Sequence, residues 1–177
     1  MRYAGSGLMA LGALLMLFYP SMWVYGKVSQ AVLQREWQQD ENTSKPPALS
    51  GIFGRLVIPK LWMDQVVLEG VGDSELARGP AHFPQSAIPG DGNCVIIGHL
   101  NIDGSPFKDL DKLRPGDEVL VQAHDRLVTY NVAASRVISP TDVSVVAPSA
   151  GDRLVLLTCT PGAKHRLAVF CRQVRVQ

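Results

Sequence analysis

The sequence predicts a mainly β domain of the barrel type, preceded by one N-terminal transmembrane helix. Three observations carry this prediction. From Gly51 onward, short apolar and β-branched runs recur at close spacing, with few helical segments between them. The last two runs form a strand, a short polar turn and a second strand without interruption. Before Gly51, a long stretch without charge precedes a Pro- and Ser-rich segment, which separates an anchor from a globular domain.

Composition limits the function classes that the chain can serve. The chain has 177 residues, a net charge of +1 and 46% hydrophobic residues, enough for one domain with an appendage. No basic stripe is present, so we expect no nucleic-acid partner. The three cysteines are an odd number, which leaves at least one thiol unpaired. They form no Cys-x-x-Cys pair and the histidines are scattered, so we expect no metal site.

Residues 1–27 are interpreted as a membrane anchor. No charge lies between Arg2 and Lys27, and a helix needs roughly 20 residues to cross the hydrocarbon core. Aromatic residues suited to the interface gather toward one end: Phe18, Tyr19, Trp23 and Tyr25. Pro20 can kink the helix, and membrane helices tolerate proline because neighbouring polar groups satisfy the backbone groups that it leaves unpaired. A cleaved signal peptide is the alternative, but no clear cleavage site follows before Gln30.

Residues 28–50 connect the anchor to the domain. Residues 28–41 are polar and predict a short helix leaving the membrane, and residues 42–50 predict a linker. Residues 51–177 then form a domain of ordinary size. Its first half predicts strands at 54–58 and 65–69, a helical turn at 74–78, an ordered Gly- and Pro-rich loop at 79–92 and a buried strand at 93–97.

The second half of the domain begins with a predicted short helix. Ser105 and Pro106 suit the N-cap and first position of this helix, with Phe107, Leu110 and Leu113 on its apolar face. The segment after it predicts a turn at 115–116, strands at 118–123 and 127–138 joined by a turn at 124–125, and a loop at 139–152.

The closing stretch, residues 154–169, predicts the hairpin on which the functional argument rests. If Cys159 ends its first strand and Arg166 begins the second, the two residues stand opposite each other on one face. His99 also follows the end of a buried strand. A thiol can attack a carbonyl, an imidazole can protonate the leaving amine, and an arginine can hold the oxyanion. The simpler interpretation is that Cys159 is a buried core residue and His99 a surface residue, neither with a catalytic role.

Several runs together resemble the sortase family of membrane-anchored cysteine transpeptidases. These are GHLNIDGSPFKDLDKLRPGDEV from Gly98, LLTC ending at Cys159 and HRLAV from His165, with GRLVIPKL from Gly54 and GPAHFPQSAIPG from Gly79. The resemblance covers nearly the whole domain and is closest to class D, with class E as a competitor. Val155 stands where the family pattern has a threonine.

The resemblance implies an eight-stranded β-barrel in which Cys159 is the nucleophile, His99 the general acid/base and Arg166 the donor to the substrate carbonyl. It implies cleavage of an LPxTG-like sorting signal through a thioacyl-enzyme, which an amine of a peptidoglycan precursor resolves. The partners would be secreted proteins with a C-terminal sorting signal, and no cofactor is required. The domain would lie outside the cell on a single-pass membrane helix.

The remaining candidates have simpler interpretations. Cys94 and Cys171 lie an odd number of positions from His99 and Arg166, so regular strands would turn them away from the site. His82 and His124 fall in predicted loops, where we expect solvated side chains, and Asp103 suits a turn better than a role in orienting His99. Two rival functions stay open: a thiol peptidase that transfers to water, and a non-catalytic membrane-tethered barrel that binds extended peptides.

Overall fold

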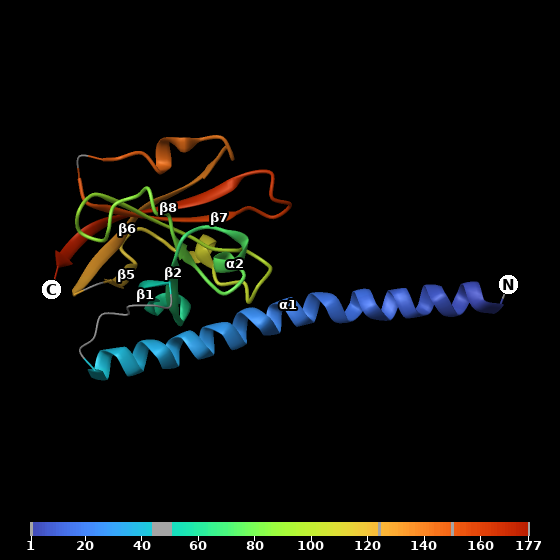
Figure 1. Cartoon of the computed structure of the whole chain (residues 1–177). Coiled ribbons are helices and arrows are strands. Elements are labelled where there is room, and N and C mark those ends of the chain that lie inside the picture. Colours follow the sequence, from blue (N-terminus) through green and yellow to red (C-terminus); the bar gives the residue numbers. More distant parts are fainter. Residues whose placement is uncertain (1, 44–50, 124, 150, 177) are drawn as a thin grey trace.

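A long helix and a closed barrel make up the chain in this computed structural model, which describes residues 2–43, 51–123, 125–149 and 151–176. Helix α1 (Arg2–Thr43) runs without interruption through Pro20, so it joins the predicted anchor and the predicted polar helix. Its N-terminal half projects beyond the barrel and its C-terminal half lies along it (Figure 1). Within the described residues, no helix combines the length and apolarity that a membrane span requires. Most of the predicted linker, residues 44–50, lies outside the described residues.

Eight strands form the barrel: β1 (Ile52–Ile58), β2 (Met63–Glu69), β3 (Ala81–His82), β4 (Asn93–Ile97), β5 (Glu118–Ala123), β6 (Arg126–Ile138), β7 (Arg153–Cys159) and β8 (Arg166–Val176). Their order is β1-β2-β3-β4-β7-β8-β6-β5, and antiparallel pairing of β1 with β5 closes it. The pair of β4 and β7 is parallel, which brings together two strand ends far apart in sequence. The predicted eight-stranded β-barrel is therefore confirmed.

The described parts of the connections hold four short helices: η1 (Pro59–Leu61), α2 (Asp73–Leu76), η2 (Leu110–Lys112) and η3 (Val143–Val145). The helix predicted to begin at Ser105 is wrong, because Ser105 has a left-handed φ of 51° that cannot start a helix. Turns and η2 replace it, yet the three predicted apolar residues, Phe107, Leu110 and Leu113, are all buried. The predicted turn at 124–125 includes His124, which lies outside the described residues.

Strand alternation separates two of the three apolar clusters among the described residues, one on each face of β4, β7 and β8. The inner cluster fills the barrel and includes Cys94, Tyr130, Leu156 and Cys171. The outer cluster lies on the opposite face of β4, β7 and β8, where η3 and its neighbours cover it. Its members include Val95, Val145, Val146, Leu157, Ala168 and Phe170.

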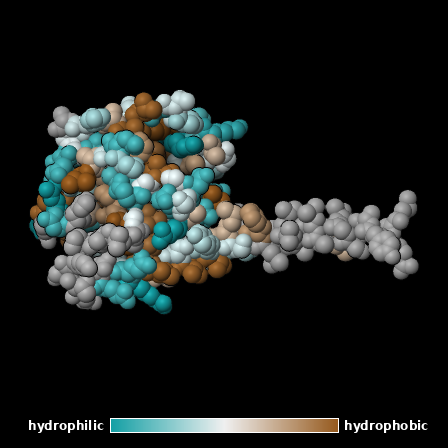
Figure 2. Space-filling view, viewed as in Figure 1, coloured by the Kyte–Doolittle hydropathy of each residue, from teal (hydrophilic) through white to brown (hydrophobic). Residues whose placement is uncertain are grey.

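Helix α1 packs on the barrel through apolar and polar contacts. Leu33 and Trp37 are buried against β1, β2 and β3. The Gln30 amide both donates to the Val66 carbonyl and accepts from the Val66 N–H, each at 3.0 Å. The Gln30 amide thus satisfies the backbone N–H and C=O of Val66 on the edge of β2. Strand β3 does not reach them, since it pairs only with Leu68 and Glu69. Figure 2 shows a hydrophobic strip along the side of α1 that faces away from the barrel.

Candidate active site

Cys159 and Arg166 occupy facing ends of the closing hairpin, as predicted. Cys159 is the last residue of β7, Arg166 is the first of β8, and the two are paired in the ladder. The Cys159 thiol is free and only partly buried. Cys159 is therefore the least buried of the three cysteines.

His99 comes to the other side of Cys159 through the parallel pairing of β4 with β7. Ile97 pairs with Leu157, and two further bonds extend the contact beyond the strand. The Gly98 N–H donates to the Leu157 carbonyl at 3.1 Å, and the Thr158 hydroxyl donates to the Gly98 carbonyl at 2.8 Å. Continued two residues past Ile97 and Leu157, the same register puts position 99 opposite Cys159, and neighbouring strands lie about 4.8 Å apart. The backbone thus leads toward His99 on one side of Cys159, and Arg166 is its ladder partner on the other.

All three residues belong to the outer face of the barrel. Residues two apart on a strand share a face, so Cys159 follows Leu157, and Arg166 precedes Ala168, both in the outer cluster. His99 follows Val95 and Ile97, which pack in or against the same cluster. The candidate site therefore lies at one end of an apolar surface covered in part by the segment around η3.

Close packing fixes the backbone before His99. A Cβ added to Gly98 would lie 2.7 Å from the Phe107 ring, so only glycine fits there. The Phe107 N–H donates to the His99 carbonyl at 3.0 Å. Nε2 of His99 lies 3.5 Å from Oδ2 of Asp103, and their side chains are 26% and 5% exposed. Asp103 also has a left-handed φ of 51°, so it serves the predicted turn and contacts His99 as well.

The loop from Thr160 to His165 holds the Arg166 guanidinium. Nη1 of Arg166 donates to the carbonyls of Ala163 and His165, both at 3.1 Å. The Thr160 N–H donates to the His165 carbonyl at 3.0 Å and closes the loop. Gly162 and Ala163 supply the left-handed φ values of 77° and 56° that this tight return needs. The guanidinium is therefore tethered at one nitrogen, at the mouth of the hairpin.

Cys94 and Cys171 lie in the inner cluster, where the parity argument put them. Burial raises the pKa of the Cys171 thiol to about 12. Burial, followed by the nearby charge of Glu69, raises the pKa of Cys94 still further above its ordinary value. Both thiols are therefore protonated and shielded at neutral pH, and Cys159 is the accessible one.

His82 differs from the expectation of a solvated loop residue, because residues 81–82 form β3 and bury it. Its ring stacks on Phe53 with centroids 3.8 Å apart. Nδ1 lies 3.0 Å from Glu69, and Nε2 lies 3.0 Å from the Ser86 hydroxyl. This network ties the loop that follows β3 to the barrel wall. Across the described part of the chain, no group of three His, Cys, Asp or Glu side chains could hold a metal ion.

Comparison with known proteins gives consistent matches. The family described as the sortase domain matches residues 56–174. Sortase SrtE1 of Streptomyces coelicolor is 30% identical over an alignment covering 98% of this chain and 57% of that relative. Sortase D of Bacillus subtilis is 25% identical, with coverages of 77% and 71%. The chain thus spans less than two thirds of the length of the first relative.

Solved structures agree with the fold. Sortase E1 from Streptomyces coelicolor, with a tripeptide in its active site, matches with a TM-score of 0.67 and 32% identity, covering 71% of this chain and 90% of that one. Sortase E from Streptomyces avermitilis matches with a TM-score of 0.65 and 36% identity, with coverages of 71% and 90%.

Proposed function

The chain belongs to the sortase family, and from this membership we propose that it is a cysteine transpeptidase with Cys159 as its nucleophile. The observation that carries the proposal is the strand register. It supports the proposal because Cys159 pairs with Arg166 in the ladder, and the pairing of β4 with β7, continued past Ile97, leads to His99 on the other side of the thiol. Identities of 30% and 36% to class E relatives, against 25% to a class D relative, favour class E.

In the first half-reaction, the Cys159 thiolate attacks the threonine carbonyl of an LPxTG-like sorting signal. The electron pair moves to the carbonyl oxygen, where Arg166 donates a hydrogen bond. When the tetrahedral intermediate collapses, the threonine–glycine peptide bond breaks and His99 gives its proton to the leaving amine. The product is a thioacyl-enzyme on Cys159.

In the second half-reaction, an amine of a peptidoglycan precursor attacks the thioester. His99, now neutral, takes the proton from this amine as the new amide bond forms. The Cys159 thiolate leaves and the enzyme returns to its starting state. The client is a secreted protein with a C-terminal sorting signal, which ends joined to the cell wall.

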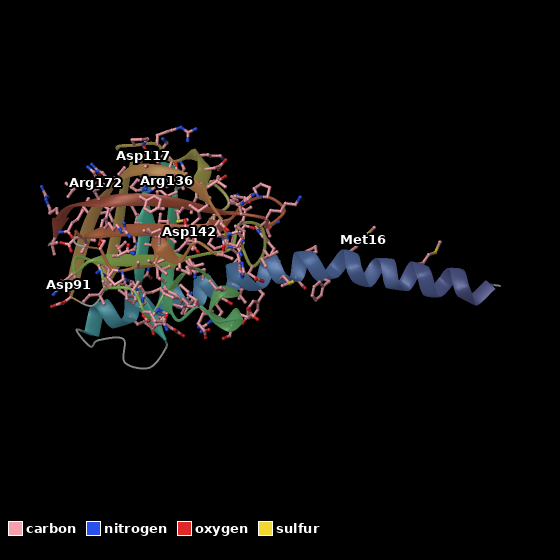
Figure 3. All side chains as sticks on the ribbon, turned by 90° about the horizontal axis from the view of Figure 1, so that it is seen from above. Met16, Asp91, Asp117, Arg136, Asp142 and Arg172 are labelled. Atoms are coloured by element: carbon pink, nitrogen blue, oxygen red, sulfur yellow. The ribbon has the colours of Figure 1, made fainter. Side chains whose placement is uncertain are left out.

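We also propose that residues 3–26 anchor the chain in the membrane with the barrel outside the cell. The uncharged stretch of sequence supports this proposal. The projecting half of α1 carries exposed apolar side chains, among them Met16 at 80% exposure, well away from the barrel (Figure 3). Large apolar side chains exposed in series are typical of a surface that meets lipid or a partner.

The test is product analysis with the full chain, a sorting peptide and an added amine. Transpeptidation predicts an acyl adduct on Cys159 and an amide product that depends on the amine. Cys159→Ala should form neither, whereas Cys171→Ala should form both. If the peptide is hydrolysed to the same extent with and without the amine and no amide product forms, the chain would be a thiol peptidase instead. A peptide that binds without acylating Cys159 would indicate a non-catalytic barrel.

A further inference from the structure

The contact between α1 and the barrel places the candidate site at the level where the uncharged stretch ends. Gly26, the last residue of that stretch, packs on the backbone of Asp103 and Gly104 so closely that a Cβ would lie 2.3 Å from the Asp103 carbonyl. Asp103 in turn contacts His99. The loop that holds His99 therefore lies beside the point where α1 passes from uncharged to charged residues.

The barrel has a defined orientation relative to the projecting half of α1. The loop between β7 and β8 lies at the end from which α1 projects, and the C-terminus lies at the other end (Figure 1). A membrane that holds residues 3–26 would thus face the end of the barrel with Cys159. The opposite end would face away.

An exposed tryptophan lies close to this boundary. Trp62 is 97% exposed and has a left-handed φ of 50° after η1, so its ring stands free of the barrel. It lines one hollow with eight other residues, among them Lys27, Pro106 and Lys108, and also Asp109, whose carboxylate pairs with Lys112 outside the hollow. We call Trp62, Lys27, Pro106 and Lys108 the Trp62 surface. Tryptophan with an apolar body and a polar N–H suits the membrane–water interface.

The charges of the Trp62 surface suit an anionic partner. Nearby lysines outside it are neutralised, since Lys60 pairs with Asp117 at 2.7 Å and Lys112 with Asp109 at 2.8 Å. No ion pair to a described acidic side chain involves Lys27 or Lys108. The ammonium nitrogen of Lys27 instead lies 5.8 Å from the ring centroid of Trp23, an exposed aromatic residue of α1.

We propose that the Trp62 surface docks on the bilayer, with Trp62 in the headgroup layer and Lys27 and Lys108 against anionic lipid phosphates. The occupant is the bilayer because the surface is continuous with the segment of α1 that enters it. The inference rests on the anchoring of residues 3–26 given under the proposed function. Its consequence is that the barrel does not hang freely from α1 but rests on the membrane by the end that holds Cys159.

The test uses the full chain in phosphatidylcholine–phosphatidylglycerol vesicles, with Trp62 as the reporter. Trp23→Phe and Trp37→Phe together leave Trp62 as the single tryptophan, and among the described residues the Trp37 N–H has no hydrogen-bond partner to lose. We expect acyl chains brominated near the headgroup to quench Trp62 at least two-fold more than chains brominated near the bilayer centre. Lys108→Glu should weaken this quenching.

A tryptophan at the opposite end is the matched control. Val174 is also exposed and lies on β8 near the C-terminus, so Val174→Trp in a background with Phe at 23, 37 and 62 should not be quenched. If Trp37→Phe lowers the folded yield, the difference between Trp23→Phe and Trp23→Phe/Trp62→Phe reports the same signal.

The outcomes separate the anchor from the docking surface. Flotation with the vesicles after alkaline carbonate extraction reports the anchor. Loss of flotation would overturn the anchor, and the docking surface with it. Normal flotation with Trp62 emission as in water would overturn the docking surface alone. A blue shift of Trp62 without bromine quenching would overturn it too, in favour of contact with a protein or a second copy.

Discussion

At the scale of single residues, the Arg166 guanidinium is fixed by two hydrogen bonds and still has N–H groups that make no bond to the loop. Both carbonyls that it contacts are bound by Nη1. The guanidinium has five N–H donors, so those on Nε and Nη2 can point toward a substrate. Under the proposed mechanism, these donors would bind the carbonyl oxygen of the substrate.

Replacing Arg166 by Ala is therefore expected to lower kcat by about 10²–10³, the usual effect of losing one oxyanion donor. Arg166→Lys should rescue poorly, because an ammonium cannot bind the loop carbonyls and the substrate with one planar group. Steady-state transpeptidation of both variants measures this. If the pH profile of Cys159 alkylation moved by more than about one unit in Arg166→Ala, Arg166 would act chiefly on the thiolate instead.

The buried thiols make a second prediction, on stability at alkaline pH. The folded pKa of Cys171 is about 12, above the unfolded value, so the folded state retains a proton that the unfolded state loses. The stabilisation is complete below about pH 9 and is lost as the pH rises toward about 12. Each such thiol should lower the free energy of unfolding by about 1.4 kcal/mol per pH unit in that window.

Urea unfolding of the full chain at about pH 8 and about pH 10.5 measures this loss. Cys94→Ala/Cys171→Ala is the control, and its stability should fall less over the same interval. Equal losses in the two proteins would show that the thiols do not set the alkaline limit. Because the two proteins differ only at positions 94 and 171, the titration of surface carboxylates and lysines contributes equally to both losses.

The sequence predicts the pairing of Cys159 with Arg166 because a hairpin relates residues that are close in the chain. It does not predict the neighbours that come from elsewhere in the fold. Thr158 reads as one more β-branched strand residue, yet its hydroxyl holds the Gly98 carbonyl. His82 reads as a loop residue, because a strand as short as residues 81–82 gives no alternation to detect.

At the scale of elements, α1 is coupled to the candidate site through Gly26. Gly26→Ala should lower the free energy of unfolding by about 1–3 kcal/mol, the usual cost of overpacking. It should also lower turnover, since the displaced backbone is that of Asp103, which contacts His99. Urea unfolding and steady-state transfer of the full chain measure the two effects.

Gly12→Ala is the matched control in the same helix, because a Cβ there meets nothing within 4 Å. Alanine is the better helix former, so this change should leave stability the same or slightly higher and turnover unchanged. A Gly26→Ala protein that behaves like Gly12→Ala would mean that α1 does not support the His99 loop.

Elements were predictable where a local pattern specifies them. The spacing of Phe107, Leu110 and Leu113 predicts their burial, but residue type alone suggests a helix start at Ser105. Its left-handed backbone belongs to a turn in which the Ser105 N–H donates to the Ile102 carbonyl. The contact of Gly26 with Asp103 joins segments far apart in sequence, and no periodicity in either segment indicates it.

At the scale of the whole molecule, the proposed anchor and the proposed extracellular site give a topology that can be tested. With residues 3–26 in the membrane and the barrel outside, protease added to intact protoplasts should release the domain from the membrane fraction. A cytoplasmic marker that remains intact serves as the control. A domain that is cut only after the protoplasts are lysed would show that the topology is reversed.

The parallel pairing of β4 with β7 also sets when the reactive centre can exist. Gly98 and Thr158, which its extension joins, are 60 positions apart in the chain. Folds dominated by such distant contacts have a high contact order and fold slowly, typically in milliseconds to seconds. Until β7 pairs with β4, the emerging polypeptide carries a solitary thiol with no histidine beside it. Under the proposed mechanism, assembly of the barrel is therefore the step that brings His99 toward the Cys159 thiol, and an unfinished chain lacks this acid/base partner.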